Sequence, residues 1–337
     1  MDVIKRWRCP AAVAGWAIGL ATLGLATWTG ACSAQTASGW PQRPVKIIAP
    51  FAAGGLADVL ARSVAERLTQ SLGQPVLVEN RTGAGGNVRA DAVARAEPDG
   101  HTLLMSSAGI LTINQYLYAK MPFDAATAFT PVTVVADMPM LLVVRNDVAA
   151  KDVKEFIALN KATSGGLFFG SPGNGTTGHL GMELFMHAAG VKLQHVPYKS
   201  AAEAVQSTLA GQTQALFDNP PTIMAQIKSG GLRALGVAAR ERMPQLPNVP
   251  TIDEAGLAGF EASSWFGLVA PAKTPAAVVE RLRNEVAAAL KDAAMQSRFA
   301  SGGARLVGDS PAQFAQLIAQ DRARWEKVIT AAGIRLQ

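Results

Sequence analysis

The stretch PVKIIAPFAAGGLADVLARSVAERLTQSLGQPVLVEN, residues 44–80, decides the fold. An apolar run is followed by a glycine turn, a segment with helical spacing of apolar residues that stops at Gly73, and a second apolar run. Nearly continuous apolar strands separated by a helical period are typical of a βαβ unit, and such units build parallel sheets. We therefore predict a strand over 44–51, a turn and helix over 52–73, and a strand over 74–80.

The same alternation continues along the chain, with a loop and helix over 81–100 and a strand over 101–107. A second set begins after Pro139, and "SSWFGLVAP" predicts a further strand over 263–271. Two helices close the chain, each opened by a hydroxyl residue and a proline at Thr274 and at Ser310. The second set has expected strands at 140–147, 167–171, 192–200, 214–219 and 232–239, and expected helices at 153–166, 177–190, 201–211 and 221–231.

Two α/β units of similar size follow from this pattern, joined by extended crossings near residues 138 and 262. We predict two doubly wound parallel-sheet domains and a two-strand hinge. Domain 1 is discontinuous, over 39–137 plus 264–337, and domain 2 covers 138–263. Ligands of open α/β sheets lie beyond the carboxyl ends of the strands, so the strand-to-helix turns are the places to look for a site.

The N-terminus predicts export. A basic start is followed by the apolar run 11–28 and by the small residues "TGACSAQ". This order is typical of a secretory signal peptide, which we place over residues 1–34. Two alternatives remain: an uncleaved anchor, since 18 apolar residues approach the lower spanning limit of about 17, and a lipoprotein on Cys32, although Thr29 stands where a bulky aliphatic residue is usual.

Composition excludes several classes. The two cysteines, Cys9 and Cys32, both precede the predicted cut, so thiol catalysis, cysteine-bound metal and disulfides are not expected in the mature chain. The net charge is +6, and the 28 basic and 24 acidic residues after the cut leave +4, spread along the chain. This distribution argues against nucleic acid as a partner and suits small anionic ligands.

Two glycine-rich turns come early in the chain. In "PFAAGGLAD", residues 50–58, Gly54 and Gly55 would let the backbone approach a ligand, and the helix that follows offers free N–H groups to an anion. Alternatively, the glycines serve only the turn and Asp58 only favours the positive helix end. "GAGGN", residues 83–87, has Val88 where a dinucleotide fingerprint needs glycine, so it predicts a turn.

The third glycine-rich loop is "FGSPGNGTTGHLGMELF", residues 169–185. A nucleophile elbow needs glycine two residues before the serine, and Phe169 stands there. What remains is a glycine turn and a helix that begins near Thr176 or Thr177, whose hydroxyls could cap the helix or contact a ligand. We expect His179 to be neutral in the first helical turn. No pair of nucleophile and base is evident, so we predict no enzyme activity.

The remaining polar candidates are weaker. Carboxylates do not cluster around any of the four histidines, so no metal and no cofactor is expected. "VPYKS" places Tyr198 and Lys199 after a strand, where they could face a cleft or lie in solvent. "LFDNPP" places Asp218 at a strand end, where it could hold an ammonium, a hydroxyl or a water, or cap the next helix.

Together these segments resemble a known family: the periplasmic solute-binding proteins of tripartite tricarboxylate transporters, also called Bordetella uptake gene proteins. The resemblance runs from about Trp40 to Ile334. It lies in the order and spacing of "PFAAGGLADVLAR", "VENRTGAGGNV", "PDGHTLL", "FGSPGNGTTGHLGMELF", "VPYKSAAEAVQSTLAGQ", "GGLRALGV", "LPNVPTIDEAGLAGFEASSWFGLVAP" and "RWEKVITAAGI".

The resemblance implies a clamp that binds a small carboxylate between two domains without changing it. One carboxylate would be held by the first strand-to-helix loop and the facing loop of domain 2, and the other end of the ligand would meet specificity segments. The implied ligand-binding residues are Ala52, Gly54, Gly55, Ala57, Asp58, Ser107, Ala108, Ser171, Gly173, Gly175, Thr176, Thr177, His179, Tyr198, Lys199, Ser200 and Asp218. Three positions depart from the family's usual residues, namely Ala57 (Thr or Ser), Ser200 (Gly) and Gln115 (Pro).

The implied function is a periplasmic receptor that delivers an organic acid to the large and small subunits of a membrane permease, as a monomer. The alternative is a sensory protein that presents the closed form to a signalling partner. A secreted hydrolase is a third hypothesis, and turnover of an ester by the purified protein would support it. The sequence leaves the choice among tricarboxylates, dicarboxylates, acidic amino acids and aromatic acids open.

Overall fold

The computed structural model describes residues 39–50, 53, 55–80 and 84–336. The predicted signal peptide, with both cysteines, lies outside these residues, and so do two predicted site residues, Ala52 and Gly54. Along the described ranges, none of the helices is both long enough and apolar enough to cross a lipid bilayer.

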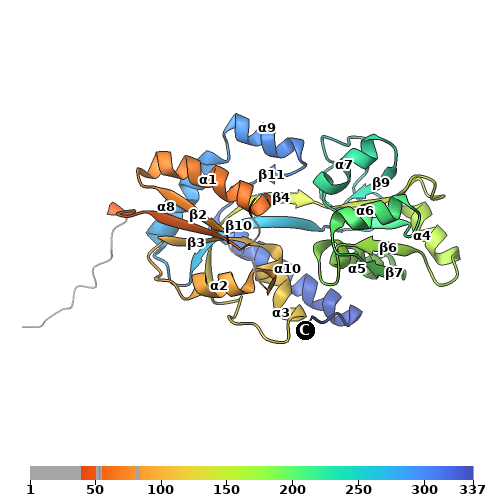
Figure 1. The fold of residues 1–337 in the computed structure, drawn as a ribbon, viewed down its shortest axis with the longest axis horizontal. Helices are drawn as coiled ribbons and strands as arrows, with labels where there is room; N and C mark the ends of the chain where they lie inside the picture. Colours follow the sequence, from red (N-terminus) through yellow and green to blue (C-terminus); the bar gives the residue numbers. More distant parts are fainter. Residues whose placement is uncertain (1–38, 51–52, 54, 81–83, 337) are drawn as a thin grey trace, which may run out of the picture. The chain divides into compact units, whose positions relative to one another are not determined.

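The first sheet has six strands in the order β11-β4-β10-β3-β1-β2 (Figure 1). β1 pairs in parallel with β2 and with β3, as the opening stretch predicts. β10 is antiparallel to both β3 and β4, and β11 is antiparallel to β4. Its strands are β1 (Val45–Ala49), β2 (Val76–Asn80), β3 (Thr102–Ser107), β4 (Phe129–Pro139), β10 (Ser263–Pro271) and β11 (Arg305–Leu306).

The second sheet has five strands in the order β7-β6-β8-β5-β9. β6 pairs in parallel with β7 and β8, whereas β5 is antiparallel to β8 and β9. Its strands are β5 (Leu141–Arg145), β6 (Phe168–Ser171), β7 (Gln194–Pro197), β8 (Ala215–Asp218) and β9 (Leu232–Val237).

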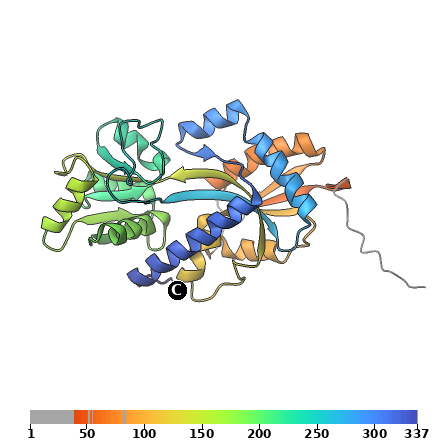
Figure 2. The same ribbon diagram turned by 180° about the vertical axis from the view of Figure 1, so that it is seen from behind.

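Helices cover both faces of each sheet, as Figures 1 and 2 show. One face of the first sheet packs against α1, α8 and α9, and the other against α2, η3 and α10. The second sheet lies between α4 and α5 on one face and α6 and α7 on the other. The helical elements are α1 (Leu56–Leu72), η2 (Ala84–Gly86), α2 (Asn87–Ala94), η3 (Gly109–Ile113), α3 (Asn114–Leu117), α4 (Val153–Ala162), α5 (Thr177–Ala189), α6 (Ala201–Leu209), α7 (Pro220–Lys228), α8 (Ala276–Ala289), α9 (Ala293–Ser301) and α10 (Pro311–Ala332).

The α/β class with two sheets is confirmed, but the prediction that both sheets are parallel is wrong in part. β5 follows β4 after a single residue, so the chain enters the second sheet running against β8 and β9. β4 and β10 lie antiparallel because one leaves the first sheet and the other returns to it. The domain boundaries at 137 and 264 stay a prediction.

Two details at the C-terminal helices differ from expectation. The helix predicted to open at Thr274 divides in two, because α8 ends at Ala289 and the Asp292 side chain accepts the Met295 N–H to start α9. Thr274 does not cap α8, since its hydroxyl donates to the Pro271 carbonyl at 2.8 Å. At α10, in contrast, Ser310 and Gln313 form a full capping box and Gly333 ends the helix at a φ of 65°.

Backbone hydrogen bonds link the two crossings between the sheets to each other and to the residue after β9. The Met140 N–H donates to the Ala262 carbonyl at 3.1 Å, and the Ala238 N–H donates to the Met140 carbonyl at 2.9 Å. A second connection lies at α10, where Trp325 and Ile329 pack with Leu180 of α5. These contacts place the carboxyl ends of β6 and β8 near the elements of the first sheet.

Candidate functional site

The site is built around the β6–α5 loop, residues 172–176. Gly173 and Gly175 have φ values of 120° and 73°, which are accessible to glycine and strained for other residues. The loop ends where α5 begins, and Thr176 is the N-cap residue, as the sequence predicts. Its hydroxyl donates to the Gly173 carbonyl at 2.7 Å, so it closes the turn as well as capping the helix.

Ser171 ends β6 and is buried, with 1% of its surface exposed. Its Oγ lies 2.6 Å from His195 Nε2 and accepts the Gly173 N–H at 3.1 Å. No pair of nucleophile and base was evident in the sequence, and this contact brings a hydroxyl and an imidazole together. The parallel pairing of β6 and β7 sets Phe169 beside His195, on the face that Ser171 shares, and this register was the missing signal.

His195 also stacks on His179, the histidine of the first turn of α5. The ring centroids are 3.9 Å apart and the planes differ by 9°. Burial, together with a smaller effect of the neighbouring His179, lowers the pKa of His195 to about 4. The neutral ring is therefore the form in which His195 meets Ser171 at neutral pH.

His179 is buried, and both of its ring nitrogens have partners. Nδ1 accepts the Gly175 N–H at 3.0 Å, and Nε2 lies 3.4 Å from Glu183 Oε1. The structure thus brings Ser171, Gly173, Gly175, Thr176 and His179 together in one hydrogen-bonded loop. Thr177 follows as the first residue of α5 and is half-buried.

The first strand-to-helix turn is described in part. Gly55 is the N-cap residue of α1, and its helix begins at Leu56. Ala57 is buried, and so is Asp58, whose carboxylate pairs with Arg62 Nε at 2.8 Å. The ion pair and the position of Asp58 in the first helical turn support the alternative in which Asp58 only stabilises the start of α1.

Ser107 ends β3, and Ala108 follows as the N-cap residue of η3. Because β1 and β3 pair in parallel, their carboxyl ends lie at one edge of the first sheet, next to the turn that starts α1. Ser107 is half-buried and Ala108 is buried. The predicted site residues Ser107 and Ala108 therefore lie at the same edge of the first sheet as the turn before α1.

The segment after β7 meets the β6–α5 loop directly. The Tyr198 N–H donates to the Ser171 carbonyl at 2.9 Å, which continues the pairing of β6 and β7. Lys199 is exposed. Ser200 caps α6 by accepting the Glu203 N–H at 3.2 Å, a structural role that was not predicted from the sequence.

Asp218 ends β8 and has 4% of its surface exposed. Its Oδ1 accepts the Asn219 N–H at 2.7 Å, and among the described residues its Oδ2 has no hydrogen-bond partner. Burial raises the pKa of Asp218 to about 6, against the opposing effect of the Asn219 N–H. Asn219, not Asp218, is the N-cap residue of α7, so the capping alternative for Asp218 is wrong.

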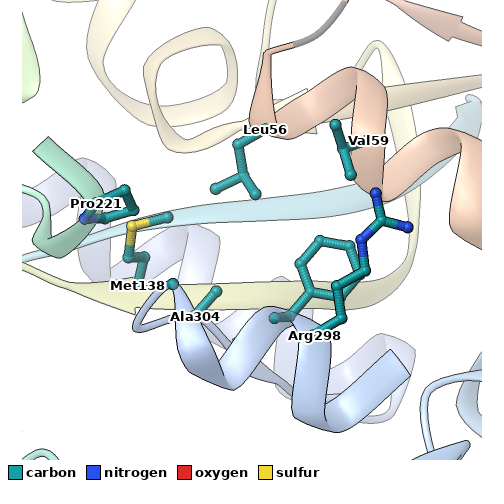
Figure 3. Close-up of a pocket in the computed structure, with 8 residues that line it drawn as sticks. Leu56, Val59, Met138, Pro221, Arg298 and Ala304 are labelled. Atoms are coloured by element: carbon teal, nitrogen blue, oxygen red, sulfur yellow. The ribbon is translucent and has the colours of Figure 1, made fainter. Parts of the chain in front are cut away.

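A cavity of about 180 Å³ lies beside these turns (Figure 3). Leu56 and Val59 of α1 line one side, Pro221 of α7 and Met138 of β4 another, and Arg298 a third. The first turn of α1 and the start of α7 therefore line the same cavity, although the two helices cover different sheets. The lining is apolar except for Arg298, so this cavity is not itself the carboxylate site that the sequence predicts.

In the part of the chain that the structure describes, His, Asp and Glu side chains form no group of three that could hold a metal ion. The donors that gather at the site are backbone N–H groups and hydroxyls. Such donors suit an anion that is held by hydrogen bonds at a helix start.

Comparison with known proteins points in one direction. The family model described as "Tripartite tricarboxylate transporter family receptor" matches residues 60–334. Protein BugT of Bordetella pertussis is 36% identical over 320 residues, covering 94% of this chain and 98% of BugT.

Two solved structures are similar over nearly the same length. The R. palustris protein Rpa4515, solved with adipate, is 38% identical with a TM-score of 0.73, covering 88% of this chain and 100% of that one. MatC from Rhodopseudomonas palustris, solved with bound malate, is 34% identical with a TM-score of 0.70, covering 86% of this chain and 100% of that one.

Proposed function

Since the chain belongs to the tripartite tricarboxylate transporter family of receptors, which are binding proteins and not enzymes, we propose that it is an extracytoplasmic receptor for a small organic carboxylate. The carboxylate binds between the two sheets and leaves chemically unchanged. The observation that carries this proposal is the β6–α5 loop, in which a glycine turn delivers Ser171 and Thr176 to the start of a 13-residue helix.

The start of α5 offers two kinds of donor. Its first N–H groups have no partner within the helix, and the helix dipole adds positive potential there. The hydroxyls of Ser171, Thr176 and Thr177 lie within the same few residues. Some of the donors at this loop already have partners in the free protein, because the Thr176 hydroxyl donates to Gly173 and the Gly175 N–H donates to His179. A bound carboxylate would replace such contacts with charge-assisted hydrogen bonds.

One loop is not enough for useful affinity. Micromolar binding requires about −8 kcal/mol, and a hydrogen bond to a charged group contributes about 1.5–3 kcal/mol, so about four net contacts are needed before the cost of association. We therefore propose that the turn before α1, with Ala52, Gly54 and Gly55, supplies the second half of the clamp.

Closure of the clamp would bring the two halves together. At one crossing Met140 alone separates β4 from β5, and its N–H donates to the carbonyl of Ala262, the residue before β10. Rotation about such crossings lets two rigid halves close on a ligand and exclude water.

We assign the other end of the ligand to Ser107 and Ala108, to Tyr198, Lys199 and Ser200, and to Asp218. Asp218 contributes an acceptor oxygen without a partner among the described residues. Asn219 Oδ1, beside it, likewise has no hydrogen-bond partner among these residues. Buried acceptors of this kind favour a ligand that brings a hydroxyl or an ammonium group. Malate, the ligand in the MatC structure, carries such a hydroxyl.

The partners follow from the family. A receptor of a tripartite transporter delivers its ligand to a membrane permease, so we propose a periplasmic location and contact with the large and small permease subunits, with the receptor as a monomer. The predicted signal peptide supports this location.

A thermal-shift screen of the chain without residues 1–34 tests the proposal. The panel holds adipate, malate, citrate, aspartate and benzoate, with glucose as a neutral solute. A ligand at 100 times its Kd adds about 2.7 kcal/mol of stability, which gives a clear rise in Tm. A rise with glucose and with no carboxylate would contradict the proposal.

A further inference from the structure

The β6–α5 loop packs against elements of the first sheet at Gly175, in the region where α3 and α10 meet α5 (Figure 1). A Cβ at this glycine would lie 2.8 Å from Leu117 Cδ1 of α3 and 3.1 Å from Leu336 Cδ1. Distances this short leave no room for a side chain, and the φ of 73° also favours glycine here. The backbone of the loop therefore lies directly on two leucine side chains, and we call Leu117 and Leu336 the loop seat.

The two leucines of the loop seat are fixed to each other through the backbone. The Leu336 N–H donates to the Leu117 carbonyl at 2.8 Å, and Tyr118 and Leu336 form a parallel bridge. The segment after α10 is also tied to that helix, because the Ile334 N–H donates to the Ile329 carbonyl at 3.2 Å. The loop seat is therefore built into the folded backbone of α3 and of residues 334–336.

The glycine turn before α2, which was predicted only as a turn, supports α3. Asn114 Nδ2 donates to the Gly85 carbonyl at 3.3 Å and to Asn87 Oδ1 at 2.6 Å. A Cβ at Gly85 would lie 2.8 Å from the Tyr118 hydroxyl. Both asparagines and Leu117 are buried, so the turn helps to hold α3 in place against the loop.

Building on the proposed function, we propose that Leu117 and Leu336 are positioning residues for the carboxylate loop. The loop belongs to the second sheet, whereas the loop seat belongs to elements that pack with the first. By fixing Gly175 against the first sheet, the two leucines set the separation between the halves of the clamp. They act through the loop and do not touch the ligand.

The place of Gly175 matters because the donors of the loop depend on it. Its N–H donates to His179 Nδ1 at 3.0 Å, and the next residue, Thr176, caps α5 and donates to the Gly173 carbonyl at 2.7 Å. Groups that bind a ligand must be held within about 0.5 Å of their productive positions by the packing around them. Truncation of either leucine leaves space into which the turn can shift.

Calorimetry with malate and with adipate at pH 7.5 measures the effect of the loop seat on binding. Leu117→Ala, at the fully buried position, is expected to raise Kd at least about fivefold, and Leu336→Ala, at the half-buried one, at least about twofold. Leu336→Met keeps the volume and the apolar character, so its Kd stays close to that of the wild type. Wild-type affinity for these carboxylates in both alanine variants would overturn the inference and leave the proposed function standing.

Leu232→Ala is the matched control for a general loss of stability. Leu232 is buried at the start of β9 and pairs with Arg145, at the edge of the second sheet opposite to Asp218. This variant should lower Tm as a core truncation does, without changing Kd. A rise in Kd as large as that of Leu117→Ala would show that any core truncation weakens binding, and would contradict the positioning role.

A double-mutant cycle isolates the contact between Gly175 and Leu117. Gly175→Ala is expected to raise Kd at least about tenfold, because its Cβ collides with the loop seat and its φ is strained. In the Leu117→Ala background the same change should raise Kd by a factor that is at least about threefold smaller, since the nearer of the two collisions is gone. Equal factors in the two backgrounds would show that the residues act independently, and would overturn the inference.

Hydrogen exchange of the free protein, followed by mass spectrometry, gives a reading that needs no ligand. Leu117→Ala should speed exchange of the amides at 173–177 at least about tenfold, whereas Leu232→Ala leaves them at the wild-type rate. Wild-type exchange in Leu117→Ala would overturn the inference even if every carboxylate binds. If no carboxylate binds to the wild type while exchange rises in Leu117→Ala alone, the proposed function fails and the role of the loop seat in holding the loop stands.

Discussion

At the scale of single residues, Ser171 shows how one contact can suggest the wrong chemistry. A hydroxyl 2.6 Å from an imidazole is the start of a nucleophile and base pair. A hydrolase would orient the base through a third polar group, whereas the ring of His195 packs against the rings of His179 and Phe169. The Ser171 hydroxyl is also tied to Gly173. The contact therefore fits a group that holds a ligand.

Ser171→Ala is expected to raise the Kd for the bound carboxylate by a factor of about ten to a hundred, because one hydrogen bond to a charged group contributes about 1.5–3 kcal/mol. Calorimetry at pH 7.5 measures the change. Ser229→Ala, at the exposed end of α7, is the control and leaves Kd unchanged. Equal affinities for Ser171→Ala and the wild type would remove Ser171 from the site.

Asp218 gives a prediction about stability. Its folded pKa of about 6 lies above its ordinary value, so the folded state favours the protonated form and loses stability as pH rises from about 4 to above 6. Asp218→Asn should therefore be more stable than the wild type at pH 7.5, by on the order of 2–3 kcal/mol. Urea unfolding without ligand measures the difference, which should vanish near pH 4.

The control for this prediction has the opposite sign. The Ala126 N–H and the Thr127 hydroxyl lower the pKa of Asp124, an exposed residue. Asp124→Asn should therefore lose stability at pH 7.5. If Asp218→Asn were also less stable than the wild type at pH 7.5, Asp218 would already have a partner in the free protein.

At the scale of elements, the sequence predicted what local chemistry decides. The start of α5 at Thr176, the start of α10 at Ser310 and the end of α1 at Gly73 each follow from a few neighbouring residues, and all are confirmed. Features that depend on how the strands pair were not predicted. β4 was expected only as an extended crossing near residue 138, and β5 was expected near its place but not in its antiparallel direction. The contact of Ser171 with His195 depends on the register of β6 and β7.

The packing of α5 on the second sheet provides a prediction for an element. A Cβ at Gly181 would lie 2.5 Å from the Phe217 ring and 3.3 Å from Met140 Sδ. Gly181→Ala should therefore cost about 1–3 kcal/mol through overpacking, although alanine is the better helix former by about 1 kcal/mol. Urea unfolding decides between the two effects, and a more stable variant would show that α5 can move away from the sheet.

At the scale of the whole molecule, the proposed clamp requires motion. The sheets are linked by the crossings at Met140 and Ala262, while α10 reaches Leu180 of α5 with Trp325 and Ile329. Small-angle scattering should show a smaller radius of gyration when a saturating carboxylate is added. Identical dimensions with and without ligand would contradict hinge closure but not binding itself.

The most direct test of the central claim is to follow both binding and the fate of the ligand. The chain without residues 1–34 is titrated with malate and adipate by calorimetry, and the ligand is then recovered and examined by nuclear magnetic resonance. The account predicts saturable binding of one carboxylate per chain and a ligand recovered unchanged. Conversion of the ligand, or the absence of binding by any carboxylate of the thermal-shift panel, would contradict it.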